Sequence, residues 1–328
     1  MSNRFMQPLR ITIQWCYLFF IVYLGFRFYQ FFAGYKAGGL SPTFDRPEGV
    51  EGFLPIAALL GIRDWYASGS INQVHPASVV ILLSAVLVSL LLRRSFCSWI
   101  CPVGTVEELL WKRGFSLFKR NIRLPDWLDN ILRSPKYLLL AFFIYFIFIK
   151  MPIEQVNGFI ASDYNKIADA KLLAFFLKLS GLPLIFILVF LLLSLPIRNP
   201  FCRFLCPYGA LLGLFALFSP AKVTRDNKTC VSCGVCSQFC PVYIPVMVKE
   251  RVHSPECVGC WRCISYCRAE GALSMKLPGR KLAIPGIIFA LLVLLIFCGG
   301  TFIGKATGNW KSVVSADEYG RVLKELIP

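Results

Sequence analysis

Residues 96–104 read FCSWICPVG, and residues 201–209 read FCRFLCPYG. Both stretches keep the order Phe-Cys-x-aromatic-aliphatic-Cys-Pro-x-Gly, and each one follows a long apolar run. Two cysteines spaced four residues apart lie about 40° apart around a helix, so each pair should face one way. The repetition predicts two similar helix–cysteine units, referred to below as the two CxxxCP segments, at the ends of two hydrophobic segments.

The composition around these segments is that of an α-helical integral membrane protein. The chain has 328 residues, of which 56% are hydrophobic and 16% are charged, and its mean hydropathy is +0.62. A soluble domain usually carries about a quarter charged residues. Lys and Arg number 35 against 18 Asp and Glu. We expect this basic excess to reflect topology and lipid contact, without any nucleic-acid partner.

Five apolar runs predict transmembrane helices, since about 20 mostly apolar residues are needed to cross the hydrocarbon layer. They lie near residues 11–33, 76–92, 137–153, 174–196 and 284–304. The fourth run contains Gly181-Leu182-Pro183, which predicts a kink or a later start. The stretch 53–62 is too short to cross and predicts an interfacial or re-entrant segment.

The basic residues are distributed unevenly between the two sides of these spans. The N-terminus, the 93–136 loop and the 197–283 region hold 23 Lys and Arg against 8 Asp and Glu. The connections on the other side hold 10 of each kind. Because cytoplasmic loops are enriched in Lys and Arg, we expect a multi-pass protein of the cytoplasmic (inner) membrane. Its N-terminus would be cytoplasmic and its C-terminal tail outside.

Eight of the fourteen cysteines form two regular quartets. Residues 230–241 read CVSCGVCSQFCP and residues 257–268 read CVGCWRCISYCR, each with the spacing C-x2-C-x2-C-x3-C. This is the spacing of a bacterial-type ferredoxin with two [4Fe–4S] clusters, in which the fourth cysteine of each run ligates the other cluster. We therefore assign one cluster to Cys230, Cys233, Cys236 and Cys267, and the other to Cys257, Cys260, Cys263 and Cys240.

The alternative interpretation of the quartets is two structural zinc sites. Such sites usually combine two C-x2-C pairs separated by a longer loop, which two intact quartets do not resemble. The ferredoxin interpretation predicts an inserted α+β domain over residues 222–283. It also predicts small residues, such as Gly234 and Gly259, where backbone N–H groups approach the cluster sulfurs.

The cysteines of the two CxxxCP segments are Cys97, Cys101, Cys202 and Cys206. In the expected topology both segments end at the cytoplasmic membrane face as parallel repeats, so their four thiols could hold a further iron–sulfur cluster. Two redox-active dithiols are a second interpretation. Buried cysteines without a chemical role are a third. Pro102 and Pro207 should interrupt the helices, and Gly104 and Gly209 should permit sharp turns.

With these motifs in place, the chain resembles the NapH/NosR-type membrane polyferredoxins over roughly residues 76–283; CcoG-type cytochrome oxidase assembly proteins share the same core. The resemblance implies electron passage between the quinone pool, iron–sulfur centres and a partner redox protein. It implies a subunit of a respiratory quinol dehydrogenase complex. The alternative is an assembly factor that reduces a metal or thiol on another protein, and a redox sensor is a third interpretation.

The predicted organisation has four parts. They are a membrane domain with four helices and both CxxxCP segments (1–221), the ferredoxin domain (222–283), a fifth transmembrane helix (284–304) and an outer tail (305–328). Histidine side chains in general titrate near neutrality, so His75 is a weak candidate for a quinone site. The tail reads SADEYGRVLKELI over 315–327, which predicts a short amphipathic helix capped by Ser315 that could dock a partner.

Overall fold

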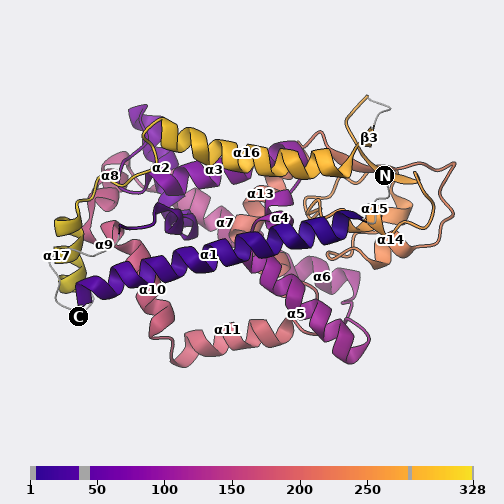
Figure 1. The fold of residues 1–328 in the computed structure, drawn as a ribbon, viewed down its shortest axis with the longest axis horizontal. Coiled ribbons are helices and arrows are strands. Elements are labelled where there is room, and N and C mark those ends of the chain that lie inside the picture. Colours follow the sequence, from indigo (N-terminus) through magenta and orange to yellow (C-terminus); the bar gives the residue numbers. More distant parts are fainter. Residues whose placement is uncertain (1–4, 37–44, 280–282, 327–328) are drawn as a thin grey trace. The chain divides into compact units, whose positions relative to one another are not determined.

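The computed structural model describes residues 5–36, 45–279 and 283–326, and it is mostly helical (Figure 1). The α-helices are α1 (Met6–Lys36), α2 (Pro55–Ser68), α3 (Pro76–Leu92), α4 (Ser95–Trp99), α5 (Pro102–Phe118), α6 (Asp126–Leu132), α7 (Ser134–Ile144), α8 (Ile153–Ala161), α9 (Asp163–Lys166), α10 (Ala168–Leu177), α11 (Gly181–Leu193), α12 (Pro200–Phe204), α13 (Pro207–Leu217), α14 (Val235–Gln238), α15 (Arg262–Ser265), α16 (Gly286–Ala306) and α17 (Ala316–Leu326). Short 3-10 turns lie at Glu48–Phe53 and Val246–Val248, and a π-helical turn lies at Tyr145–Lys150.

Three helical stretches within the described residues are long and apolar enough to cross a membrane, namely Met6–Tyr35, Asp126–Lys150 and Gly286–Ala306. A fourth crossing is reached if α10 and α11 count as one broken span, since they are bent by 79° at a short break. That break ends at Gly181, where the sequence predicted a kink or a later start. The second predicted span coincides with α3, a shorter apolar helix. The chain is thus a membrane protein, and a count of five crossings stays a prediction.

The chain divides into two compact units. The first unit comprises residues 1–18, 85–140 and 186–297, and the second comprises 19–84, 141–185 and 298–328. The chain passes from one unit to the other five times, and each passage lies within a helix (α1, α3, α7, α11 and α16). Residues 222–283 lie in the first unit together with both CxxxCP segments, and the predicted four-part organisation stays a prediction.

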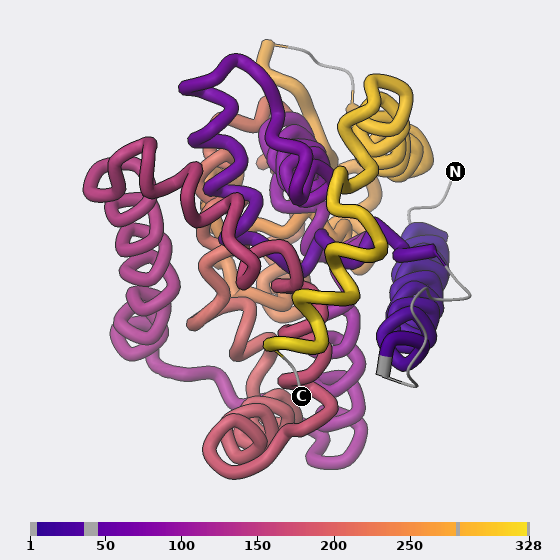
Figure 2. Tube along the Cα trace, turned by 90° about the vertical axis from the view of Figure 1, so that its left-hand side faces the viewer, coloured from indigo at the N-terminus to yellow at the C-terminus, as the bar shows by residue number. Residues whose placement is uncertain are grey.

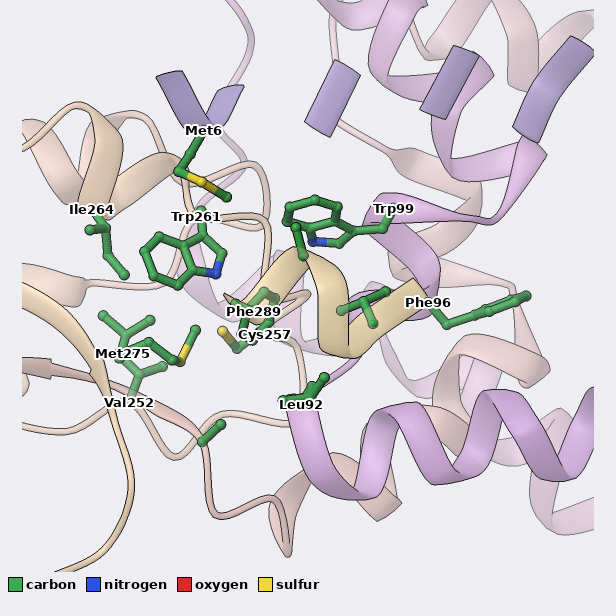
Figure 3. Packing of buried hydrophobic residues seen from close by; sticks show 14 of the residues in the cluster. Met6, Leu92, Phe96, Trp99, Val252, Cys257, Trp261, Ile264, Met275 and Phe289 are labelled. Carbon is green, nitrogen blue, oxygen red and sulfur yellow. The ribbon is translucent and has the colours of Figure 1, made fainter. Parts of the chain in front are cut away.

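The first unit contains the sheet and both cysteine quartets. Strands β1 (Lys222–Arg225), β2 (Leu273–Lys276) and β3 (Ala283–Ile284) form an antiparallel sheet in that order, with Val223 opposite Met275. Both of these side chains point into the core, as alternation along a half-buried strand requires. The core also takes in Leu92, Trp99 and Phe289, so strands and helix ends pack as one apolar cluster (Figure 3).

The second unit has a separate core formed around the end of α1 and the tail helix. Phe31 and Tyr35 pack against Tyr319 and Leu323, all of them buried. Figure 2 traces the chain, with α17 as the yellow segment that ends at the C mark. The backbone N–H of Glu318 donates to Ser315 Oγ over 3.2 Å, which confirms the predicted cap. The apolar face of α17 is covered by its own chain, and docking of a partner by this tail stays a prediction.

Candidate metal centres

A pocket in the first unit is lined by Cys230, Cys233, Cys236 and Cys267. These four cysteines are the set that the quartet spacing groups together. Cys233 is exposed at the surface, whereas Cys236 is buried. The other lining residues are largely small or apolar, including Met247 and Leu273. A hydrogen bond from Arg225 lowers the pKa of the Cys230 thiol.

A second pocket in the same unit is lined by the other predicted set, Cys240, Cys257, Cys260 and Cys263. This pocket is deeper, because Cys240 and Cys257 are buried and the walls carry Val, Ile and Trp side chains. Burial raises the pKa of the Cys240 thiol to about 12. The neutral thiol is therefore favoured at Cys240, and a bound metal would have to displace its proton.

The two quartets fold alike around their second cysteines. Ser232 and Gly234 flank Cys233 with φ of 53° and 75°, and Gly259 and Trp261 flank Cys260 with φ of 58° and 61°. A positive φ on both sides of one cysteine is uncommon, and its recurrence gives the two quartets the same local backbone conformation. Gly259 has a further reason to be glycine, since an added Cβ would lie 2.3 Å from Ser95 Oγ.

The two CxxxCP segments share a local conformation. Cys97 and Cys202 lie in the short helices α4 and α12, while Cys101 and Cys206 are the N-cap residues of α5 and α13. The predicted interruption is present in both segments, since α4 ends at Trp99 and α12 at Phe204. Each proline then occupies the first turn of a new helix, where its missing N–H is not needed. A common symmetry axis for the two halves of the membrane domain stays a prediction.

Gly104 and Gly209 also have a role different from the predicted sharp turns. Both lie in the first turn of a regular helix, α5 or α13. A Cβ on Gly104 would lie 2.2 Å from the carbonyl oxygen of Cys97, and one on Gly209 would lie 3.6 Å from that of Cys202. Gly104 therefore lets α5 approach Cys97. At Gly209 the distance to Cys202 is ordinary van der Waals contact, and the close neighbour of an added Cβ is Arg94 Nη2 at 2.9 Å.

Glu107 of α5 joins the two segments. Its carboxylate accepts hydrogen bonds from the backbone N–H groups of Phe201 (2.8 Å) and Cys202 (3.2 Å) at the start of α12. Burial raises the pKa of the Cys101 thiol to about 12, and both Cys97 and Cys206 add to this shift. The Cys101 thiol thus lies within electrostatic range of a cysteine from each segment, and the structure brings all four cysteines into one neighbourhood.

The second quartet is attached directly to the first CxxxCP segment. Ser98 Oγ donates to the carbonyl oxygen of Val258, and the Trp99 indole N–H donates to that of Gly259 at 3.1 Å. Glu108 of α5 accepts hydrogen bonds from Arg10 and, over 3.1 Å, from Arg262, which lies next to Trp261. Figure 3 shows Cys257 and Trp261 beside Phe289 and Trp99 in the apolar cluster.

The donor sets suit iron–sulfur clusters. Each quartet pocket offers four thiols and no histidine or carboxylate among its lining residues. Over the part of the chain that the structure describes, no three His, Cys, Asp or Glu side chains converge closely enough to hold a single metal ion. In each quartet the four assigned cysteines line one pocket.

His75 belongs to the second unit, where a buried ionic cluster surrounds it. Its Nδ1 lies 3.0 Å from Glu51 Oε1, and its Nε2 lies 2.6 Å from the carbonyl oxygen of Asn165. Arg46 pairs with Glu51 at 2.9 Å and with Asp169 at 2.7 Å. Burial alone would lower the pKa of His75, but Glu51 outweighs it and the net shift is upward.

Sequence reasoning did not find the partners of His75, nor the buried charges beside the cysteines. Glu51 and Asp169 lie 24 and 94 residues from His75, so no spacing rule links them. The same holds for Arg93 and Arg94, which directly follow α3 and are both buried. Arginines at the end of an apolar helix, here one of 17 residues, usually point to water. The sequence therefore contains no signal that these two would be buried.

Comparison with known proteins agrees with this arrangement. A family model described as a 4Fe-4S binding domain matches residues 74–125 and 179–225, which contain the two CxxxCP segments. A model described as a 4Fe-4S dicluster domain matches residues 222–268, which contain both quartets.

Several proteins of known sequence are similar over long stretches. YccM of Escherichia coli K12, named for electron transport, is 38% identical over 309 residues, covering 93% of this chain and 86% of YccM. The ferredoxin-type protein NapH of the same organism is 24% identical over 214 residues, 61% of this chain and 70% of NapH. The methylamine utilization ferredoxin-type protein MauN of Paracoccus denitrificans is 30% identical over 181 residues, 53% and 59% of the two chains. No solved structure matches.

Proposed function

Because this chain belongs to the NapH-type family of ferredoxin-type membrane electron transport proteins, we propose that it carries electrons between membrane quinone and a partner redox protein. It would do so as a subunit of a respiratory quinol dehydrogenase complex in the inner membrane. The N-terminus and the quartets would face the cytoplasm, and the tail would lie outside, in keeping with the distribution of Lys and Arg.

Three sets of cysteines would hold the cofactors. Cys230, Cys233, Cys236 and Cys267 would ligate one [4Fe–4S] cluster, and Cys257, Cys260, Cys263 and Cys240 a second. Cys97, Cys101, Cys202 and Cys206 would ligate a third. When bound, such clusters accept and release single electrons. The third set is supported by the family model that spans both CxxxCP segments.

The observation that carries this proposal is the attachment of the second quartet to the first CxxxCP segment. The hydrogen bond from Trp99 to Gly259 lies in a buried apolar cluster with Trp261 and Phe289. These side chains hold the two segments in a fixed register and exclude water between them. Close, dry and rigid spacing is what electron exchange between cysteine-held centres requires of a protein.

The first quartet is the part of this assembly that is open to solvent. Cys233 is exposed, and so are Val231 and Val248 at 65% and 66%. Exposed apolar side chains beside a ligand suit brief contact with another protein. We therefore assign the partner protein to this face.

The quinone side of the proposal rests on the family and on His75. Oxidation of a quinol releases protons, and His75 with Glu51 forms a buried pair that can hold one. Glu48, Asp169 and Arg46 complete the ionic cluster in the second unit. His75→Gln is expected to slow reduction of the protein by a quinol analogue without changing its iron content.

Ligation also fits the CxxxCP thiols better than dithiol exchange does. The thiolate is the attacking species in exchange, and reactive cysteines therefore have a lowered pKa. Burial raises the pKa of Cys101 to about 12 and that of Cys206 to about 11. Buried neutral thiols exchange slowly, whereas binding to iron removes their protons.

The test is an iron and sulfide count on the full chain, purified anaerobically in detergent. Cys97→Ser should lose about a third of the iron, since one of three equal clusters is removed. Cys16→Ser, a cysteine outside all three sets, is the matched control and should keep its iron. A Cys97→Ser protein with the full iron content would rule out the third site.

A further inference from the structure

Arg94 lies between the CxxxCP cysteines and the second quartet. It directly follows Arg93 at the end of α3, and the residue is only 2% exposed. Its Nη1 pairs with Glu256 Oε2 at 3.2 Å, and Glu256 immediately precedes Cys257. A guanidinium buried this deeply needs negative charge around it, because desolvation of an ion is costly.

The rest of the guanidinium faces the CxxxCP cysteines. Cys97 and Cys202, one cysteine from each segment, both lie within electrostatic range of it. A Cβ added to Gly209 would lie 2.9 Å from Arg94 Nη2 and 3.6 Å from Cys206 Sγ, so both groups border the same glycine. Arg94 is therefore near cysteines of both segments.

The neighbouring charges leave Arg94 only partly neutralised. The Glu256 carboxylate is shared with Lys136, whose Nζ lies 2.6 Å from Oε1 and 2.8 Å from Oε2. Tyr137 OH also donates to Glu256, at 3.0 Å. Two buried cations thus share one carboxylate. In addition, Arg94 Nε is buried without a hydrogen-bond partner among the described residues. The surplus positive charge lies beside the thiols.

We propose that Arg94 is a positioning residue that offsets the negative charge of four ligating thiolates at the CxxxCP site and thereby raises the reduction potential there. This inference rests on the proposed third cluster. Iron–sulfur potentials depend on net charge, hydrogen bonds to sulfur and solvent exposure. A fixed cation in a low-dielectric interior favours the state with one more electron, so its removal should make that state harder to reach.

Arg93 provides a matched control. It has the same chemistry and is fully buried, but its guanidinium donates to the backbone carbonyl oxygens of Ala216 and Ser254. Its loss should destabilise the fold without acting on the thiols.

The test is a potentiometric titration of the full-length protein in detergent, followed by electron paramagnetic resonance, with iron counted in parallel. Arg94→Gln should shift one of the three signals to a more negative potential, and Arg94→Lys should restore most of the shift. Arg93→Gln should leave that potential in place. An unchanged potential in Arg94→Gln, or an equal shift in Arg93→Gln, would overturn the inference.

A second variant covers the case in which Arg94→Gln does not accumulate. Gly209→Ala would push the guanidinium away, and the same signal should shift in the same direction by a smaller amount. The Cys97→Ser iron count distinguishes the absence of a third cluster from the absence of an Arg94 effect on its potential. Full iron in Cys97→Ser removes the third cluster and this inference with it. Lost iron in Cys97→Ser together with unmoved potentials removes this inference alone.

Discussion

The indole N–H of Trp99 donates a hydrogen bond to the carbonyl oxygen of Gly259 at 3.1 Å, with both residues buried. Trp99 lies two residues after Cys97, and Gly259 directly precedes Cys260. This bond fixes the distance between segments that are 160 residues apart in sequence. The second quartet and the first CxxxCP segment therefore form one structural site.

Gly259→Ala should disturb this site more than an ordinary glycine substitution does. The residue has a φ of 58°, and the new Cβ would lie 2.3 Å from Ser95 Oγ and 3.2 Å from the Leu92 carbonyl oxygen. The left-handed conformation alone costs an alanine about 1–2 kcal/mol. The clash should also displace residues 257–263, so we expect loss of iron from the second quartet.

Gly271→Ala is the control for that substitution. It has a φ of 78°, but open space surrounds the added Cβ. It should therefore keep its iron and lose only a little thermal stability. Equal iron loss in the two variants would show that backbone conformation matters here and that the contact with Ser95 does not.

Glu256→Gln should destabilise the first unit by about 3–5 kcal/mol, because it leaves the buried Lys136 and Arg94 without their shared carboxylate. Lys136→Met in the same background should recover part of the loss. A double-mutant cycle of thermal unfolding measures this coupling. Strictly additive effects of the two substitutions would contradict the predicted interaction.

The stability of the second unit should decrease as the pH rises. Burial raises the pKa of Glu48 to about 7 from its ordinary 4.5, and Glu51 adds to the shift although Arg46 opposes it. The folded state thus holds a proton that the unfolded state releases. The stabilisation is complete below pH 4.5 and is lost as the pH rises through 7.

Thermal unfolding midpoints from roughly pH 5 to pH 8 test this dependence. The wild-type midpoint should fall over that range, and Glu48→Gln should flatten the decline. Glu51 raises the pKa of His75 in the same direction, so a smaller slope should persist in the variant. If the midpoint of Glu48→Gln falls with pH as steeply as that of the wild type, groups other than Glu48 cause the pH dependence.

Leu323→Ala should loosen the tail helix from the second unit. Leu323 is 1% exposed and packs in the cluster with Phe31 and Tyr35. Large-to-small substitutions in a core usually cost about 2–5 kcal/mol. We expect proteolysis within residues 309–326 to become faster, while Glu325→Ala, on the exposed face, should digest like the wild type.

The local features of this chain could be predicted from its sequence because their signals are local. The quartet spacing, the apolar runs, the break at Gly181 and the Ser315 cap each depend on residues within a few turns of one another. The resemblance to NapH-type proteins also rests on such short motifs. Similarity to YccM, NapH and MauN confirms it.

The buried charges could not be predicted because their partners come from distant segments. Glu256 meets Lys136 across 120 residues, and His75 meets Asn165 across 90. The role of the glycines in the CxxxCP segments was misassigned for a related reason. Glycine is compatible with both a sharp turn and the first turn of a helix, and only the packing of Gly104 on the Cys97 carbonyl distinguishes them.

The central claim is that cysteine-held iron–sulfur clusters carry electrons in this membrane protein. The most direct measurement is the metal and acid-labile sulfide content of wild-type protein purified without oxygen. Three [4Fe–4S] clusters predict about twelve iron and about twelve sulfide per chain. Zinc in place of iron, with no sulfide, would contradict the account.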